Sequence, residues 1–332
     1  MAFFDLSEDQ LRAYTGQATL PVDFEAFWQA TLDEQVLGDP AVEYAELDGP
    51  VTAYRVFEMS FCGYGGTRVN TWVRVPTTAA GPLATVVNFI GYSGSRGYPW
   101  KDSHFVQAGY VHVMVDSRGQ GWNTRQFSDS TPDPDPSRGE MSAPGMMTSG
   151  VLDRDTYYYR RLYIDAIRSV QAVRTLPWVD PHRLVVAGAS QGGGLTLAAA
   201  GLAEMAGIEL AGTLVDVPFL CDFPRAVGLT DAYPYREIVD YLRNNPQYTD
   251  QVFNTLSYFD GVNFARRIHA PGLFSTALMD QVCPPSTVFA AYNNYPSPDK
   301  DIRVWRWNGH EGGQEHMIME QLHWLSSHFV DR

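Results

Sequence analysis

The stretch VVAGASQGGG, from Val185 to Gly194, joins a run of apolar and β-branched residues to three consecutive glycines, with one serine at the junction. This pattern predicts a buried strand, a sharp turn at Ser190 and a helix that begins at the glycines. Gly188, Ser190 and Gly192 form G-x-S-x-G, in which small neighbours leave room for a strained strand-to-helix turn. Each glycine in a helix costs up to about 1 kcal/mol relative to alanine. Three together therefore mark a local conflict of the kind found at functional sites.

Short apolar runs alternate with helical patterns on both sides of this turn. Continuous apolar strands separated by helices indicate a mostly parallel sheet with helices on both faces. The runs, in chain order, are ATVVNFIG, YVHVMVDSRGQG, RLVVAGAS, LAGTLVDVPF, APGLFSTALMD and IRVWRW, and EHMIMEQLHWLSSHF predicts a last helix. Before them, VTAYRVFEMSF and RVNTWVRVP alternate on either side of CGYGGT and predict an antiparallel hairpin.

We therefore expect a single α/β-hydrolase domain over residues 1–332, because this fold carries its nucleophile on such a turn. The N-terminal segment and the hairpin occupy residues 1–83. The stretch from about 221 to 267 is too long for a connecting loop and predicts a helical insertion beside the sheet. Proline and glycine in residues 128–150 predict a long irregular loop.

Composition narrows the class of partner. The chain has 332 residues, of which 45% are hydrophobic and 19% charged, and a formal net charge of −14. Such an acidic chain is a poor partner for nucleic acid or anionic lipid, so we expect a neutral or cationic small substrate. No apolar run approaches the roughly 20 residues of a membrane span, and the start MAFFDLSEDQLRAY lacks the features of a secretion signal. These features predict a cytoplasmic protein.

The sequence offers no clear metal site or disulfide framework. Cys62, Cys221 and Cys283 are odd in number, widely separated and without a CxxC pair, so we expect free buried thiols. The segment HEGGQEH, which starts at His310, lacks the second histidine of a zinc HExxH helix, because residue 314 is glutamine. We expect neither a metal nor another cofactor.

A serine hydroxyl becomes nucleophilic at neutral pH when an imidazole removes its proton and a carboxylate orients that imidazole. His310 follows the strand IRVWRW in the glycine-rich loop NGHEGG and is the candidate base. The alternative is a loop histidine at the cap of the last helix. The other histidines precede the serine, precede a strand or lie in the last helical pattern: His104, His112, His182, His269, His316, His323 and His328.

Two aspartates compete for the role of the acid. Asp280 ends the strand LFSTALMD, directly before the histidine strand, and is the stronger candidate. Asp216 ends the strand after the nucleophile, in TLVDVPF, and is expected to bond to backbone in the core.

Backbone N–H groups complete the candidate site. That of Gln191 stands at a helix N-terminus, where a developing oxyanion is stabilised. The second donor is expected after the strand ATVVNFIG, where Tyr92 is the first residue. The alternative for the whole stretch is an ordinary strand-to-helix turn with Ser190 as a helix cap.

Three motifs together resemble one family. RGQ (Arg118, Gly119 and Gln120), GASQGGG around Ser190 and HE (His310 and Glu311) are similar to the signature of the acetyl xylan esterase and cephalosporin C deacetylase family, carbohydrate esterase family 7. YYYRR, VDVPFL, TLSYFDGVNFA and CPPSTVFAAYN also look like phrases of that family, so the likeness runs from end to end.

The resemblance implies a serine esterase with Ser190 as nucleophile, Asp280 as acid, His310 as base, and Tyr92 and Gln191 as oxyanion donors. It implies that Arg118, Gly119, Gln120 and Glu311 support the site, although Arg118 and Glu311 alone indicate an ordinary surface ion pair. It also implies acetylated xylo-oligosaccharides and cephalosporin C as small substrates, an intracellular location and a ring-like homohexamer.

Two other functions use the same residues. A serine peptidase of the prolyl oligopeptidase kind has this triad, but such proteins carry a large N-terminal propeller and only about 80 residues precede the sheet here. A catalytically silent hydrolase fold usually lacks one member of the triad, and all three are available in this sequence.

Overall fold

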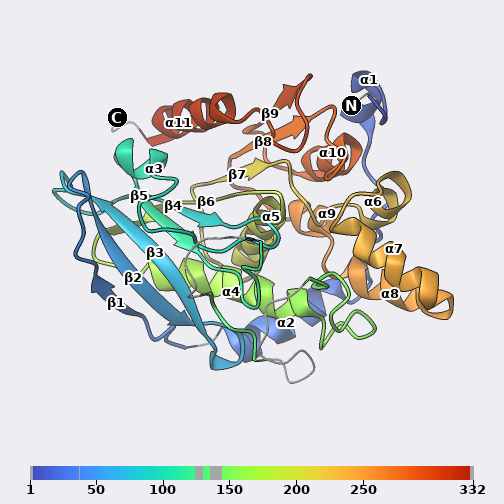
Figure 1. Ribbon diagram of the computed structural model, residues 1–332, viewed down its shortest axis with the longest axis horizontal. Coiled ribbons are helices and arrows are strands. Elements are labelled where there is room, and N and C mark those ends of the chain that lie inside the picture. The colour runs from blue at the N-terminus through green and yellow to red at the C-terminus, as the bar shows by residue number, and fades with distance from the viewer. Residues whose placement is uncertain (1–2, 37, 124–129, 135–143, 330–332) are drawn as a thin grey trace.

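The computed structural model describes residues 3–36, 38–123, 130–134 and 144–329. These residues contain one nine-stranded sheet with the strand order β1-β2-β3-β5-β4-β6-β7-β8-β9 (Figure 1). The strands are β1 (Glu43–Glu46), β2 (Tyr54–Cys62), β3 (Arg68–Pro76), β4 (Leu83–Phe89), β5 (Val111–Val115), β6 (Val179–Ala189), β7 (Gly212–Asp216), β8 (Gly272–Ala277) and β9 (Lys300–Trp305).

The six strands β4 to β9 form the parallel part of the sheet, as the continuous apolar runs predict. β2 and β3 form the predicted antiparallel hairpin, and β3 joins the parallel part by pairing antiparallel with β5. The sequence did not predict β1, whose four residues are all exposed and carry no apolar alternation. The predicted α/β-hydrolase fold is confirmed.

Helices cover both faces of the sheet (Figure 1). They are α1 (Glu8–Ala13), α2 (Phe24–Gln35), α3 (His104–Gln107), α4 (Tyr158–Val173), α5 (Gln191–Met205), α6 (Phe223–Leu229), α7 (Tyr235–Asn244), α8 (Thr249–Ser257), α9 (Gly261–Ala265), α10 (Pro285–Asn294) and α11 (Glu315–Phe329), with short 3-10 turns at Tyr64–Gly66 and Pro246–Tyr248.

Strand β6 shows how the two layers share the sheet. Leu184 and Val186 belong to the large core cluster that includes α4, α5 and α10, whereas Val185 and Ala187 pack with Trp324 of α11 on the opposite face. Since successive strand residues point to opposite faces, a strand buried on both sides must be apolar throughout. This requirement explains the uninterrupted apolar run before Ser190.

The segment between β7 and β8, which includes the residues of the predicted helical insertion, contains α6, α7, α8 and α9. Of the predicted loop over residues 128–150, residues 128–129 and 135–143 lie outside the described residues, and the described remainder contains neither helix nor strand. Within the described parts of the chain, no helix has the length and hydropathy needed to cross a membrane.

Candidate active site

Ser190 is the single residue between the end of β6 and the start of α5, and its φ of 59° is rare for a residue with a side chain. A Cβ at Gly188 would lie 2.4 Å from the carbonyl group of Gly192, and one at Gly192 would lie 2.3 Å from the carbonyl oxygen of Phe89. The two glycines of the motif therefore allow the backbones of β4, β6 and α5 to meet at this turn. The turn itself is fixed by the Ser190 N–H, which donates to the Asp216 carbonyl at 3.0 Å.

Ser190, His310 and Asp280 lie in one chain of hydrogen bonds. His310 Nε2 is 2.9 Å from Ser190 Oγ, and His310 Nδ1 is 2.9 Å from Asp280 Oδ2. Oδ1 of the fully buried Asp280 accepts the backbone N–H groups of Val282 and Cys283 at 2.8 and 2.9 Å. Because a carboxylate only accepts, Nδ1 carries the proton and Nε2 is left to accept the hydroxyl proton of Ser190. The structure thus brings together the three side chains that the sequence singled out.

The loop that carries His310 follows β9 and is shaped by Glu311. Glu311 accepts the Gly309 N–H with both carboxylate oxygens, each at 3.1 Å, and the Asn308 amide at 3.2 Å. Backbone hydrogen bonds from its own N–H and that of Gly309 lower the pKa of Glu311. Gly313 has a φ of 88°, and a Cβ there would lie 2.2 Å from the Trp305 ring. The loop can therefore fold back tightly enough to bring the imidazole over the serine.

The two candidate oxyanion donors lie beside the nucleophile. A Cβ on Gly91, which precedes Tyr92, would lie 3.9 Å from Ser190 Cβ. Gln191 is the first residue of α5. Among the described residues, neither backbone N–H donates a hydrogen bond to the protein. Both groups thus remain able to donate to an oxygen above Ser190.

The side chain of Tyr92 is tied to the helical insertion, a contact that the sequence did not predict. Its hydroxyl donates to Glu237 of α7 at 2.7 Å and accepts the Met146 N–H at 3.0 Å, and its ring packs edge-on against Trp122 and Phe219. Burial and the neighbouring Glu237 raise the pKa of the Tyr92 phenol, so it stays a neutral donor. The insertion thereby helps to hold the loop after β4.

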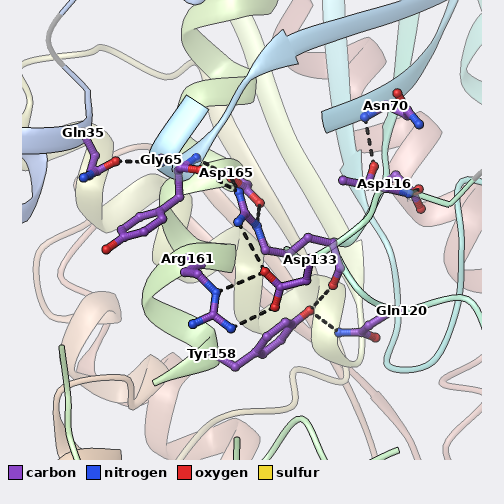
Figure 2. Close-up of polar contacts among 12 residues, drawn as sticks. Gln35, Gly65, Asn70, Asp116, Gln120, Asp133, Tyr158, Arg161 and Asp165 are labelled. Carbon is purple, nitrogen blue, oxygen red and sulfur yellow. Dashed lines mark hydrogen bonds and ion pairs between the residues drawn. The ribbon is translucent and has the colours of Figure 1, made fainter. Parts of the chain in front are cut away.

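Arg118 is buried rather than part of a surface ion pair, which corrects the interpretation of this residue without the resemblance. It is 1% exposed and binds Asp165 of α4 through Nε at 2.5 Å and Nη2 at 2.7 Å. Nη1 lies 3.5 Å from Asp133, which also pairs with Arg161 (Figure 2). Although burial opposes the charge, Asp165 and Asp133 raise the pKa of Arg118.

Arg118 and Glu311 form no ion pair with each other, because Glu311 bonds within its own loop. Gly119 has a φ of 66°, a conformation that favours glycine, and a Cβ there would lie 2.9 Å from the side chain of Asp133. Gln120 is fully buried. The RGQ motif is therefore an interior element of the fold behind the site.

Asp216, the competing acid, ends β7 and bonds to α11 rather than to the imidazole. Its carboxylate accepts a hydrogen bond from the side chain of Gln321 in α11. The expectation that this side chain bonds to backbone is wrong, because its partner is the side-chain amide of Gln321. Burial raises the pKa of Asp216 from 3.8 to about 7. Asp280, and not Asp216, is thus the carboxylate in contact with His310.

Cys283 also lies beside the nucleophile, although the sequence predicted only a free buried thiol at this position. Its thiol is fully buried beside the Ser190 hydroxyl, and burial followed by the nearby Asp280 raises its pKa well above the usual value. In the part of the chain that the structure describes, Asp280, Cys283 and His310 are the group whose potential metal-ligand atoms all lie within 4.8 Å of one another. Cys283 follows Asp280 by three positions, and this short spacing was the sequence signal that could have placed the thiol at the site.

Comparisons with known proteins agree with this architecture. A family model described as acetyl xylan esterase (AXE1) matches residues 1–328. The chain is 36% identical to the solved acetyl xylan esterase from Paenibacillus sp. R4, with a TM-score of 0.85 over 96% of this chain and 99% of that one. It is 34% identical to acetyl xylan esterase 1 from Thermoanaerobacterium sp. JW/SL YS485, with a TM-score of 0.86 over 98% and 100% of the two chains.

The acetyl esterase Axe7A of Xylanibacter ruminicola is 27% identical over 304 residues. That match covers 89% of this chain, which spans 64% of the length of the Xylanibacter protein. The family match extends over nearly the entire sequence, and the two solved relatives share its fold at more than 30% identity. The chain belongs to the acetyl xylan esterase family.

Proposed function

We propose that the protein is a serine esterase that removes acetyl groups from small acetylated carbohydrates. The observation that carries the proposal is the chain of two 2.9 Å contacts from Ser190 Oγ through His310 to the buried Asp280. Family membership supports the acetyl ester as the bond that is cleaved.

In the proposed mechanism, Ser190 Oγ attacks the acetyl carbonyl while His310 Nε2 takes its proton. The backbone N–H groups of Tyr92 and Gln191 donate to the oxyanion of the tetrahedral intermediate. When this intermediate collapses, the bond to the sugar oxygen breaks and the imidazolium returns its proton to the departing alcohol. A water molecule then gives a proton to His310 and attacks the acetyl-serine, and the second collapse releases acetic acid and restores the Ser190 hydroxyl.

The named relatives support acetylated xylo-oligosaccharides as substrates, since two of them are described as acetyl xylan esterases. Cephalosporin C is included because of the family resemblance, and the net charge of −14 disfavours polyanionic substrates. We also propose a cytoplasmic location, which the three free cysteines support, and a homohexamer, for which the family resemblance is the support.

An acyl-length series tests this function. Purified protein is expected to hydrolyse p-nitrophenyl acetate faster than the butyrate and longer esters, and to release acetate from acetylated xylo-oligosaccharides and cephalosporin C. Ser190→Ala removes the nucleophile, so its turnover should fall by at least about 10⁴-fold while its thermal unfolding stays cooperative.

Ser169→Ala is the control, because Ser169 is a buried serine whose hydroxyl bonds within α4, away from the triad. It should keep the wild-type rate. Turnover by Ser190→Ala at the wild-type level, or a preference for peptide substrates over acetyl esters, would contradict the proposed function.

A further inference from the structure

Gln120 lies between the two backbone segments that carry the candidate oxyanion donors. It follows β5, and its side chain is fully buried. Its Oε1 accepts the N–H of Ser93 at 2.7 Å. Ser93 directly follows Tyr92, so this hydrogen bond fixes the peptide next to the first donor.

The same side chain pairs with Gln191, which carries the second donor. Gln120 Nε2 donates to Gln191 Oε1 at 2.9 Å, and Gln191 Nε2 donates back to Gln120 Oε1 at 3.3 Å. Gln191 Nε2 also donates to the carbonyl of Ile90 at 3.3 Å, two residues before Tyr92. The two amides therefore link the loop after β4 to the first residue of α5.

Both amides are held by further hydrogen bonds from α4. Gln120 Nε2 also donates to the Tyr158 hydroxyl at 2.9 Å, which donates to the Arg118 carbonyl at 2.7 Å (Figure 2). The Tyr159 hydroxyl donates to Gln191 Oε1 at 3.0 Å. Each amide thus uses two donor and two acceptor positions, and rotating the Gln120 amide would place its NH₂ group against the Ser93 N–H. Its orientation is therefore fixed by its neighbours.

We propose that Gln120 is a positioning residue that sets the separation of the Tyr92 and Gln191 backbone N–H groups. The proposal rests on the proposed function, because those two groups matter only if an oxyanion forms above Ser190. The Gln120 side chain bonds to Ser93, Tyr158 and Gln191 and not to a member of the triad. Hydrogen-bond donors stabilise an oxyanion when they are held in place beforehand, and a misplacement of about 1 Å can cost on the order of 10²-fold in rate.

Gln120→Met tests the proposal, because methionine has a similar volume and makes none of these hydrogen bonds. We expect kcat for p-nitrophenyl acetate to fall by about 10- to 100-fold, since both donors remain but lose their fixed separation. KM should change by less than about threefold, because the ground-state ester makes little use of the oxyanion donors. The inhibition constant of a trifluoromethyl ketone, whose adduct with Ser190 carries the oxyanion, should rise by the factor that kcat/KM loses.

Gln120→Glu is the second variant, in case methionine impairs folding. It keeps an acceptor for the Ser93 N–H but loses the donors to Tyr158 and Gln191, so it should show the same loss in kcat and in inhibitor affinity. Asn263→Ala is the matched control: this buried amide in α9 donates to the carbonyls of Thr19 and Ser257 at 2.8 and 2.9 Å, away from the site. It should lower the unfolding temperature without changing kcat of the folded protein.

The outcomes separate this proposal from the proposed function. The positioning role is refuted if the folded Gln120 variants keep kcat and inhibitor affinity within about twofold of wild type. It is also refuted if they, like Asn263→Ala, lose activity only through a lower unfolding temperature. A wild-type protein that hydrolyses no acetyl ester and is not labelled at Ser190 by a fluorophosphonate refutes the proposed function, and this proposal with it. An active, labelled wild type with an unchanged Gln120→Met refutes this proposal alone.

Discussion

Asp280 and Asp216 follow or end neighbouring parallel strands, yet their surroundings differ. Asp280 is in contact with His310 and two backbone N–H groups, so its charge is compensated on both oxygens. Asp216 accepts a side-chain hydrogen bond from Gln321, and burial raises its pKa to about 7. Two carboxylates at one sheet edge therefore differ in what they can do. Asp280 can orient an imidazole, whereas Asp216 carries a proton for part of the time at neutral pH.

The raised pKa of Asp216 predicts a pH-dependent effect on stability. An unfolded aspartate ionises near pH 3.8, whereas folded Asp216 keeps its proton to about pH 7, so the folded state binds more protons in this window. The contribution of this group to stability is therefore present below about pH 4 and is lost as the pH rises to about 7. Asp216→Asn lacks this term. Its stability relative to wild type should rise over the same window by up to roughly 4 kcal/mol, at about 1.36 kcal/mol per pKa unit.

Urea unfolding of both proteins at several pH values between about 4 and 8 measures this difference. Subtracting the two curves removes the contributions of all other titrating groups. A difference in unfolding free energy that stays constant over this range would show that Asp216 ionises as an ordinary surface carboxylate does.

At the scale of elements, the turn from β6 into α5 depends on how closely three backbones approach one another. β4, β6 and α5 meet at Gly188 and Gly192, where no side-chain atom fits. This close approach requires a positive φ at Ser190, and the hydrogen bond from the Ser190 N–H to the Asp216 carbonyl on β7 holds that conformation. A single added methyl group should therefore disturb the sheet and the nucleophile together.

Gly192→Ala tests this dependence. The new Cβ would lie 2.3 Å from the Phe89 carbonyl oxygen, which is backbone and cannot move aside without shifting β4. We expect a loss of at least about 2 kcal/mol in unfolding free energy, as for overpacked core sites, and a loss of esterase turnover. Gly228→Ala is the control, because Gly228 in α6 is exposed and has nothing within 4 Å of a built Cβ. It should be neutral or slightly stabilising. Equal stability of the two variants would contradict the close approach.

The sequence predicted those elements whose structure depends on a pattern within a few consecutive residues. The apolar runs at residues 184–187 of β6 and 272–274 of β8 are buried on both faces of the sheet. The G-x-S-x-G turn follows from sterics within five residues. β1 was missed because its exposed residues carry no alternation. The partner of Arg118 was also missed, because Asp165 is 47 residues away and its burial depends on how α4 packs. Likewise, nothing near Tyr92 indicates that Glu237 of the insertion reaches its hydroxyl.

Across the whole molecule, the candidate site depends on segments that the chain order keeps far apart. Ser190 follows β6, Asp280 follows β8 and His310 follows β9, so their convergence follows from the parallel order of the strands. The insertion contacts the loop beside Ser190 through Glu237, which accepts a hydrogen bond from the Tyr92 hydroxyl. The N-terminal segment holds the insertion, because Asp222 accepts hydrogen bonds from the Tyr14 hydroxyl and the Gln17 N–H, each at 2.8 Å. The contacts of the site thus involve most of the chain.

Covalent labelling followed by peptide mass mapping tests the central claim most directly, because it asks which hydroxyl the assembled chain activates. After reaction with an alkyl fluorophosphonate, we predict one phosphonyl group per chain, located on Ser190, and a loss of p-nitrophenyl acetate turnover in proportion to the labelled fraction. A label on another residue, or ester turnover that survives complete labelling of Ser190, would contradict the account.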